Sequence, residues 1–340
     1  MEHDWKRGGP TGWVRGQGME SAIRSVARLR SAGQSIVRRT CQVRLRYRVA
    51  LALVVTLTAV GALVFVLAGR RGQFSTAMLT APVWLLAIAA LLHLVSLVTR
   101  SEAWNFCMRV AGGSTPRRIV FRAAGVGALA SVLSAQLGVA ARIGAIRRTA
   151  PHTSPRVPAL MAAEVPIVAV EATLAALFTF TLIGPLRLPA WVPVLVVAVM
   201  ACLVVALRRF ACRHRSGLWS GLAAVRELRG RERLIALVVV GILAQIGRNW
   251  LVLHAVGVDT SILNAIAILI VSVSLSPLPV GAGVGATATV LILGSHGLAA
   301  TAAAGVLLTV TGTVAALCYA AWACGDHALG AARIRRTALT

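Results

Sequence analysis

The chain alternates long apolar runs with short polar connections that are rich in arginine. Six of the runs have about 20 residues, the length that an α-helix needs to cross a hydrocarbon core of ~30 Å. They cover residues 49–68, 82–98, 160–183, 191–207, 234–254 and 298–323. Each run predicts a transmembrane helix.

Two further apolar stretches, 119–139 and 262–293, are interrupted by Gly, Pro, Ser or Gln. Proline removes a backbone donor and glycine favours irregular backbone, so neither stretch is expected to form one straight span. We expect the first stretch to turn near Gly125 and Gly127 and to return to the face that it entered.

The distribution of arginine decides between a full span and a re-entrant hairpin at 119–139. A full span would place the arginine-rich connections at 142–156 and 208–233 outside, against the positive-inside rule. A hairpin entering from the cytoplasm leaves only Arg70, Arg71 and Arg187 in outer connections. By the same reasoning 262–293 enters from the outer face, and both termini are cytoplasmic.

Each half of the chain therefore contains two spans, one re-entrant hairpin and a further span, with the second half inverted. Inverted repeats of this kind are common in transporters. The predicted fold class is an all-α polytopic integral membrane protein with about six full transmembrane helices and two re-entrant hairpins. The halves show no residue-level similarity, so the repeat is a hypothesis from charge and hydropathy.

Three regions follow from this topology. Residues 1–48 form a basic cytoplasmic N-terminal tail, whose true start is either Met1 or Met19. Residues 49–324 form the transmembrane domain, in which 208–233 is a basic cytoplasmic loop with leucines at the spacing of an amphipathic helix. Residues 325–340 form a short cytoplasmic tail.

Composition supports a membrane protein, because 58% of the residues are hydrophobic and only 13% are charged. The net charge of +25 comes mainly from arginines beside the apolar runs, which favours a membrane surface over nucleic acid as the partner. The six cysteines are scattered without a C-x-x-C pair, so neither disulfides nor a zinc site is predicted. We expect no metal and no cofactor.

Polar residues inside the predicted spans are the first candidates for a site. Glu164 and Glu171 lie seven residues apart in one span, and Gln245, Arg248 and Asn249 form a polar stripe on another. Such groups are costly in lipid, so they should face the protein interior. They either line a cavity for a charged headgroup, or they only fix helix packing through a Glu164–Arg248 or Glu171–Arg248 ion pair.

The interrupted segments provide the other candidates. Pro277, Pro279, Gly281 and Gly283 cannot form continuous helix, and irregular backbone at membrane depth is tolerated only against protein or water. The alternative for this segment is close packing between helices. Arg142 follows the first hairpin near the cytoplasmic interface, where it could hold lipid phosphate. No role is assigned to His93, a lone histidine in the second span.

At these two segments the chain resembles the membrane region of lysylphosphatidylglycerol synthases, a flippase-like family of bacterial integral membrane proteins. The resemblance rests on Leu137-Gly138 followed by Arg142, Arg147 and Arg148, and on Leu278-Pro279 followed by Gly281 and Gly283. It departs where the family has a proline before Leu137, a glycine at Val280, and a glutamate at Ala286 or Thr287. The aminoacyl-transferase domain of the bifunctional members is not expected here.

The resemblance and the intramembrane charges together predict a lipid translocase or lipid-binding transporter for an anionic or polyprenyl-linked lipid. We expect it in the bacterial inner (cytoplasmic) membrane and without enzymatic activity. A membrane phospholipid or lipid-linked substrate, and a neighbouring synthase, are the expected partners. Two alternatives remain open: a membrane-bound transferase acting on lipid-linked substrates, and a noncatalytic scaffold for a cell-envelope synthase.

Overall fold

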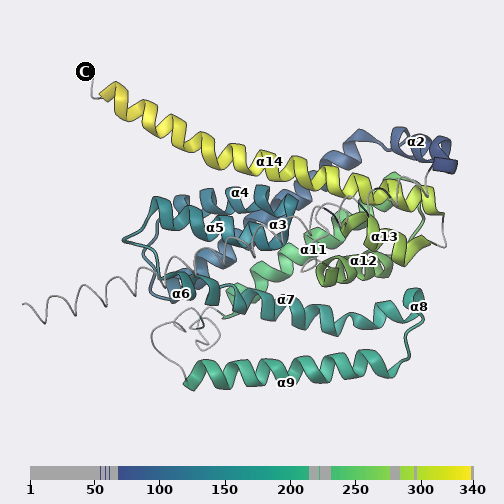
Figure 1. The fold of residues 1–340 in the computed structure, drawn as a ribbon, viewed down its shortest axis with the longest axis horizontal. Coiled ribbons are helices and arrows are strands. Elements are labelled where there is room, and N and C mark those ends of the chain that lie inside the picture. The colour runs from purple at the N-terminus through teal and green to yellow at the C-terminus, as the bar shows by residue number, and fades with distance from the viewer. Residues whose placement is uncertain are drawn as a thin grey trace, which may run out of the picture. The chain divides into compact units, whose positions relative to one another are not determined.

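The computed structural model describes Val54, Thr58, Gly61, residues 68–213, Leu222 and residues 231–275, 284–294 and 297–337, without the side chains of 284–286 and 326–337. These ranges lie in the unit Val54–Thr340, and every regular element in them is a helix (Figure 1). The helices are η1 (Ala68–Arg70), α2 (Arg71–Leu79), α3 (Val83–Val110), α4 (Arg117–Leu133), α5 (Ala135–Thr149), α6 (Val157–Ala162), α7 (Val165–Leu177), η2 (Thr179–Leu182), α8 (Ile183–Leu186), α9 (Trp191–Arg213), α11 (Arg231–Ala255), α12 (Ile262–Leu275), α13 (Val284–Leu293) and α14 (Leu298–Thr337).

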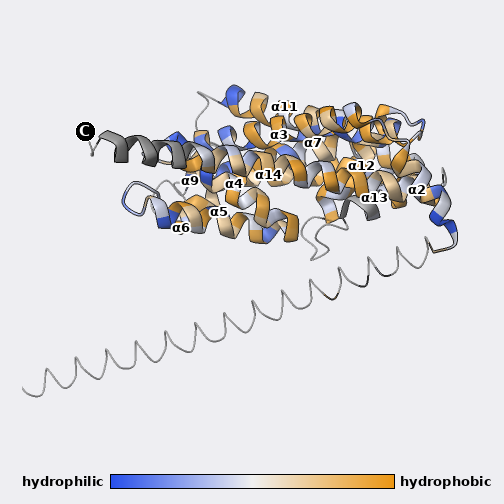
Figure 2. Ribbon diagram, turned by 90° about the horizontal axis from the view of Figure 1, so that it is seen from above, coloured by the Kyte–Doolittle hydropathy of each residue, from blue (hydrophilic) through white to orange (hydrophobic). Residues whose placement is uncertain are grey.

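Five helical stretches in the described residues are long and apolar enough to cross a membrane, which confirms an all-α polytopic membrane protein. They are Val83–Val110, Val157–Leu177, Trp191–Arg213, Arg231–Ala255 and Leu298–Gly325. The remaining predicted span, 49–68, lies largely outside the described residues. Hydrophobic residues cover most of the helices in Figure 2, and α9 leaves Val194 and Leu195 exposed, as expected for a surface in lipid.

Helices α3 and α11 pack against each other in antiparallel directions and form the centre of the unit (Figure 1). Gly241 of α11 allows this close approach, because a Cβ added there would lie 2.9 Å from Thr99 Oγ1. A Cβ added at Gly247 would lie 3.4 Å from Leu92 Cδ1. The contact at Gly247 is an ordinary van der Waals distance, whereas a larger residue at Gly241 would disturb the packing of the two helices.

The two helix pairs α4–α5 and α12–α13 start from opposite ends of this central pair. Helix α4 follows the end of α3 after a short connection, and α12 follows the end of α11. Because α3 and α11 are antiparallel, the hairpins enter from opposite sides. Helix α4 packs against α14, and α12 packs against η2, so each hairpin contacts the end of the other half. Entry from opposite sides is what the hypothesis of an inverted repeat predicts for the two helix pairs.

The first hairpin turns at Ser134, so the prediction of a turn near Gly125 and Gly127 is wrong. Ser134 has extended backbone (φ −164°, ψ 148°), and its hydroxyl accepts a hydrogen bond from the Leu137 N–H to cap α5. The two glycines serve helix packing instead. An added Cβ at Gly125 would lie 3.2 Å from Ala320 Cα, and one at Gly127 would lie 2.9 Å from the Gly138 carbonyl oxygen.

Two of the predicted polar regions lie outside the described residues. The N-terminal tail 1–48 does so completely, and the basic loop 208–233 does so for most of its length. The ends of that loop are helical, since α9 continues to Arg213 and α11 begins at Arg231. Leu222 packs against Ala162 and Ala211. Helix α14 continues through most of the predicted tail 325–340, as far as Thr337.

Candidate functional site

A cavity of about 530 Å³ lies among α3, α4, α5, α7, α11, α12 and α14, within the range typical of small-molecule sites. We call it the polar cavity. Its charged and amide side chains are Arg100, Arg142, Glu171, Gln245, Arg248 and Asn249. Hydroxyl-bearing residues include Ser131, Ser272, Thr309, Thr313 and Tyr319. So many polar groups facing one space inside a membrane protein indicate a hydrated site.

Arg248 projects from α11 and is only 9% exposed. Its Nη2 donates to the Leu308 carbonyl oxygen and lies 3.4 Å from Thr311 Oγ1. Its Nη1 lies 3.2 Å from Gln245 Oε1 and 3.3 Å from His93 Nδ1. All of these partners are uncharged acceptors if His93 is neutral. Among the described residues no carboxylate lies within ion-pair distance of Arg248, and its Nε has no hydrogen-bond partner.

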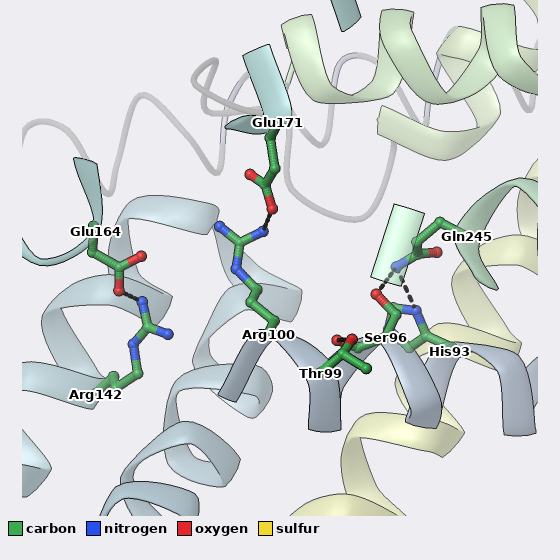
Figure 3. A network of polar contacts seen from close by, with 8 residues as sticks. All are labelled: His93, Ser96, Thr99, Arg100, Arg142, Glu164, Glu171 and Gln245. Atoms are coloured by element: carbon green, nitrogen blue, oxygen red, sulfur yellow. Dashed lines mark hydrogen bonds and ion pairs between the residues drawn. The ribbon is translucent and has the colours of Figure 1, made fainter. Parts of the chain in front are cut away.

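Arg142 projects from α5, is 7% exposed and forms an ion pair with Glu164 (Figure 3). Its guanidinium carbon lies 4.1 Å from the ring centroid of Trp104, which is fully buried on α3. Glu164 immediately precedes α7, so the pair links the first hairpin to that span. Arg142 is therefore a buried, paired residue of α5, within the first hairpin that the sequence interpretation expected it to follow.

Arg100 forms the other ion pair, with Glu171 of α7 (Figure 3). This pair is more accessible, because the side chains of Arg100 and Glu171 are 43% and 23% exposed. The two glutamates thus contact two different arginines. The prediction that Glu164 or Glu171 pairs with Arg248 is wrong, since Glu164, just before α7, pairs with an arginine of α5, and Glu171, on α7, pairs with an arginine of α3.

Asn249 also faces the polar cavity, and its Nδ2 donates to the Ala265 carbonyl oxygen at 3.4 Å. Of the predicted site residues, the polar cavity brings together Arg142, Glu171, Arg248 and Asn249. Glu164 does not line the cavity and contacts it only through its ion pair with Arg142. Pro277, Pro279, Gly281 and Gly283 lie outside the described residues. Within the described residues no group of three His, Cys, Asp or Glu side chains could hold a metal ion.

The sequence interpretation missed the contribution of α3. Gln245 Nε2 lies 3.0 Å from His93 Nδ1 and donates to Ser96 Oγ at 3.2 Å (Figure 3). Ser101 accepts a hydrogen bond of 2.8 Å from the Tyr319 hydroxyl. His93, Ser96 and Arg100 follow one another at i, i+3 and i+7, which places them on one helix face. This spacing is the feature of the sequence from which a polar face on α3 could have been predicted.

Among known protein families, the model of the lysylphosphatidylglycerol synthase TM region matches residues 42–321, a range that includes every residue lining the polar cavity. No curated protein and no solved structure matches the chain.

Proposed function

This chain belongs to the lysylphosphatidylglycerol synthase TM region family, and from that premise we propose that it binds and translocates an anionic lipid. The family is a membrane domain linked to lipid handling. The headgroup would occupy the polar cavity, and the hydrocarbon tails would stay among apolar residues. This proposal includes no catalytic step.

The proposal rests on one observation: Arg248 is buried beside the polar cavity and has no carboxylate partner among the described residues. An arginine at membrane depth costs about 2.5–3.5 kcal/mol on insertion scales, so it is normally paired or functional. In the described residues Arg248 donates to the uncharged oxygen atoms of Gln245 and Leu308 and lines a cavity. A phosphate that entered the cavity could accept charge-assisted hydrogen bonds from this guanidinium.

The charges around the polar cavity favour a headgroup with a single negative charge. Arg100, Arg142 and Arg248 face two glutamates, Glu164 and Glu171, which leaves one positive charge. Residues 276–283, outside the described ranges, add no charged side chain to the sequence. A phosphodiester would neutralise this remainder, whereas the phosphomonoester of a polyprenyl phosphate carries about −1.5 to −2 at pH 7 and would exceed it.

The antiparallel arrangement of α3 and α11 supports alternating access as the mechanism. Because the hairpins enter from opposite ends of this pair, each can close the polar cavity toward one side of the membrane. Transporters with inverted repeats commonly place their sites at such a repeat interface and rock one half against the other.

We also propose the setting in which this transport takes place. The arginine-rich connections favour the cytoplasmic membrane of a bacterium with both chain ends in the cytoplasm. A synthase in the same membrane, which would supply the lipid, is the proposed partner.

The experiment is reconstitution of the full chain into liposomes with phosphatidylglycerol that carries a fluorescent acyl chain, followed by chemical quenching of the outer leaflet. Wild type should expose inner-leaflet label, and Arg248→Ala should slow this at least about tenfold, because the headgroup loses its cation. Arg209→Ala, on the exposed end of α9, is the matched control and should retain wild-type rates.

Liposomes with labelled phosphatidylcholine or labelled polyprenyl phosphate test the headgroup charge, and both should be translocated more slowly than phosphatidylglycerol. Equal rates for wild type and Arg248→Ala would overturn the proposed role of Arg248. Absence of transport together with absence of phosphatidylglycerol binding would overturn the proposed function.

A further inference from the structure

A second, smaller cavity of about 150 Å³ lies beside the polar cavity, between α3, α7, α11 and α12. We call it the side groove. Most of its lining is aliphatic or aromatic: Ile167, Leu174, Ala175, Phe178, Leu237 and Ile270 are examples. A space with this lining offers a headgroup few hydrogen-bond partners, so its natural occupant is a hydrocarbon.

The side groove and the polar cavity are adjacent, because six residues line both of them. These are Ser96, Arg100, Glu171, Gln245, Leu269 and Val273. The Arg100–Glu171 ion pair and Gln245 therefore lie where the polar lining changes to the apolar one. An amphiphile placed across this boundary would have its charged end near Arg248 and its chain among the aliphatic residues.

The outer end of the side groove reaches a surface that faces lipid. Phe178 lines the groove but not the polar cavity, and it is 37% exposed. Phe178 ends α7, so the opening lies beside the end of this helix. In a bilayer an exposed apolar opening of this kind is continuous with the acyl chains.

We infer that the side groove holds one hydrocarbon tail of the lipid whose headgroup occupies the polar cavity. This inference rests on the proposed function and assigns a separate subsite to the tail. The polar cavity would then select the lipid by charge, and the groove would select it by the length and bulk of its chain. Free headgroup compounds would occupy the polar cavity alone.

Small residues keep the side groove open. Gly241 lines it without a side chain, and Ala175 contributes only a methyl group from α7. A Cβ at Gly241 would lie 2.9 Å from Thr99 Oγ1, so substitutions there would also disturb the packing of α3 on α11. Ala175 is the better position for filling the groove, and Leu174→Trp provides a second filling variant on the same helix.

The test measures lipid binding to the full chain in detergent micelles by native mass spectrometry, with dioleoyl and dihexanoyl phosphatidylglycerol as probes. The two share a headgroup and differ in tail length. Wild type should bind the dioleoyl probe at least about tenfold more tightly. Ala175→Trp and Leu174→Trp should lose most of that preference and should bind the dihexanoyl probe as wild type does. Val168→Trp is the control, since Val168 is 49% exposed on α7 and lines neither cavity.

The outcomes separate this inference from the proposed function. If wild type binds both probes equally, or if both filling variants keep the preference, the tail subsite is overturned while anionic lipid binding stands. If both filling variants lost binding of the two probes to the same extent, the tail subsite would also be overturned, since the substitutions would then act on the headgroup site. If wild type binds neither probe, the proposed function fails and the inference fails with it.

Discussion

The two buried arginines of the polar cavity differ in how their charge is balanced. Arg142 is paired with Glu164 and stacked on Trp104, whereas Arg248 contacts a backbone carbonyl and neutral side chains. Their burial is nearly the same, at 7% and 9% exposed. The two arginines therefore differ in their contact partners and not in how deeply they are buried in the protein.

This difference separates a structural charge from one that is available to a ligand. The Arg142–Glu164 pair links α5 to the start of α7 and is internally neutral. Arg248 has no such counter-charge among the described residues, so an anion in the polar cavity would provide it. Both arginines also lie against a glycine of a neighbouring helix, Gly127 for Arg142 and Gly312 for Arg248. Four substitutions test this comparison.

Glu164→Leu should have the largest effect on stability, because it leaves Arg142 buried without its carboxylate. Breaking one partner of a buried ion pair typically costs about 3–5 kcal/mol. The free energy of unfolding, measured by denaturant titration in mixed micelles, should fall by that amount.

The double variant Arg142→Met with Glu164→Leu provides the control, since it removes both charges together. It should recover most of the lost stability, as replacement of a whole buried pair by apolar residues often does. A double variant as unstable as Glu164→Leu alone would show that the pair does not act as a unit.

Gly127→Ala should have the next largest effect. The added Cβ would lie 2.9 Å from the Gly138 carbonyl oxygen and 3.0 Å from Arg142 Cβ, so backbone atoms of α5 must move. Overpacking of this kind typically costs about 1–3 kcal/mol of unfolding free energy. Gly144→Ala is the matched control on α5, because nothing lies within 4 Å of its added Cβ. Equal stability of the two variants would contradict close packing in the first hairpin.

The membrane-spanning helices were predictable because hydropathy over about 20 residues depends only on local composition. The first hairpin was also predictable, since counting arginines excluded a full span at 119–139. Its turn was misplaced because glycine occurs both at turns and at close helix contacts. Only the three-dimensional contacts show that Gly127 faces Gly138 and that Ser134 forms the turn.

The partners in the site could not be predicted from sequence. Glu164 and Glu171 were correctly expected to need positive partners at membrane depth, but any buried arginine satisfies that rule. Which arginine pairs with each glutamate depends on how α7 packs against α3 and α5, and no local sequence pattern encodes that packing. Arg100 was overlooked because it follows an apolar run and resembles an ordinary interfacial anchor.

Arg248→Met should change stability much less than Glu164→Leu. It removes hydrogen bonds from a charged guanidinium, each with a net value of about 1.5–3 kcal/mol, and also removes a buried charge without a counter-charge, which is worth a similar amount in the opposite direction. These effects oppose each other, so the unfolding free energy should change by less than about 1 kcal/mol. Phosphatidylglycerol transport in liposomes should nevertheless be lost. A destabilisation as large as that of Glu164→Leu would mean that Arg248 has a structural role like that of Arg142.

Gly312→Ala should have the smallest effect on stability and a selective one on transport. The added Cβ would lie 2.9 Å from Arg248 Nη2, which is the mobile end of a long side chain, so the guanidinium can move aside. We expect the unfolding free energy to change by less than about 0.5 kcal/mol, typical of a tolerated substitution. Moving the guanidinium should slow phosphatidylglycerol transport about threefold, since charge-assisted hydrogen bonds depend on geometry. Gly312→Ala thus displaces the cation without removing it, so unchanged transport would show that the position of Arg248 is unimportant and only its charge matters.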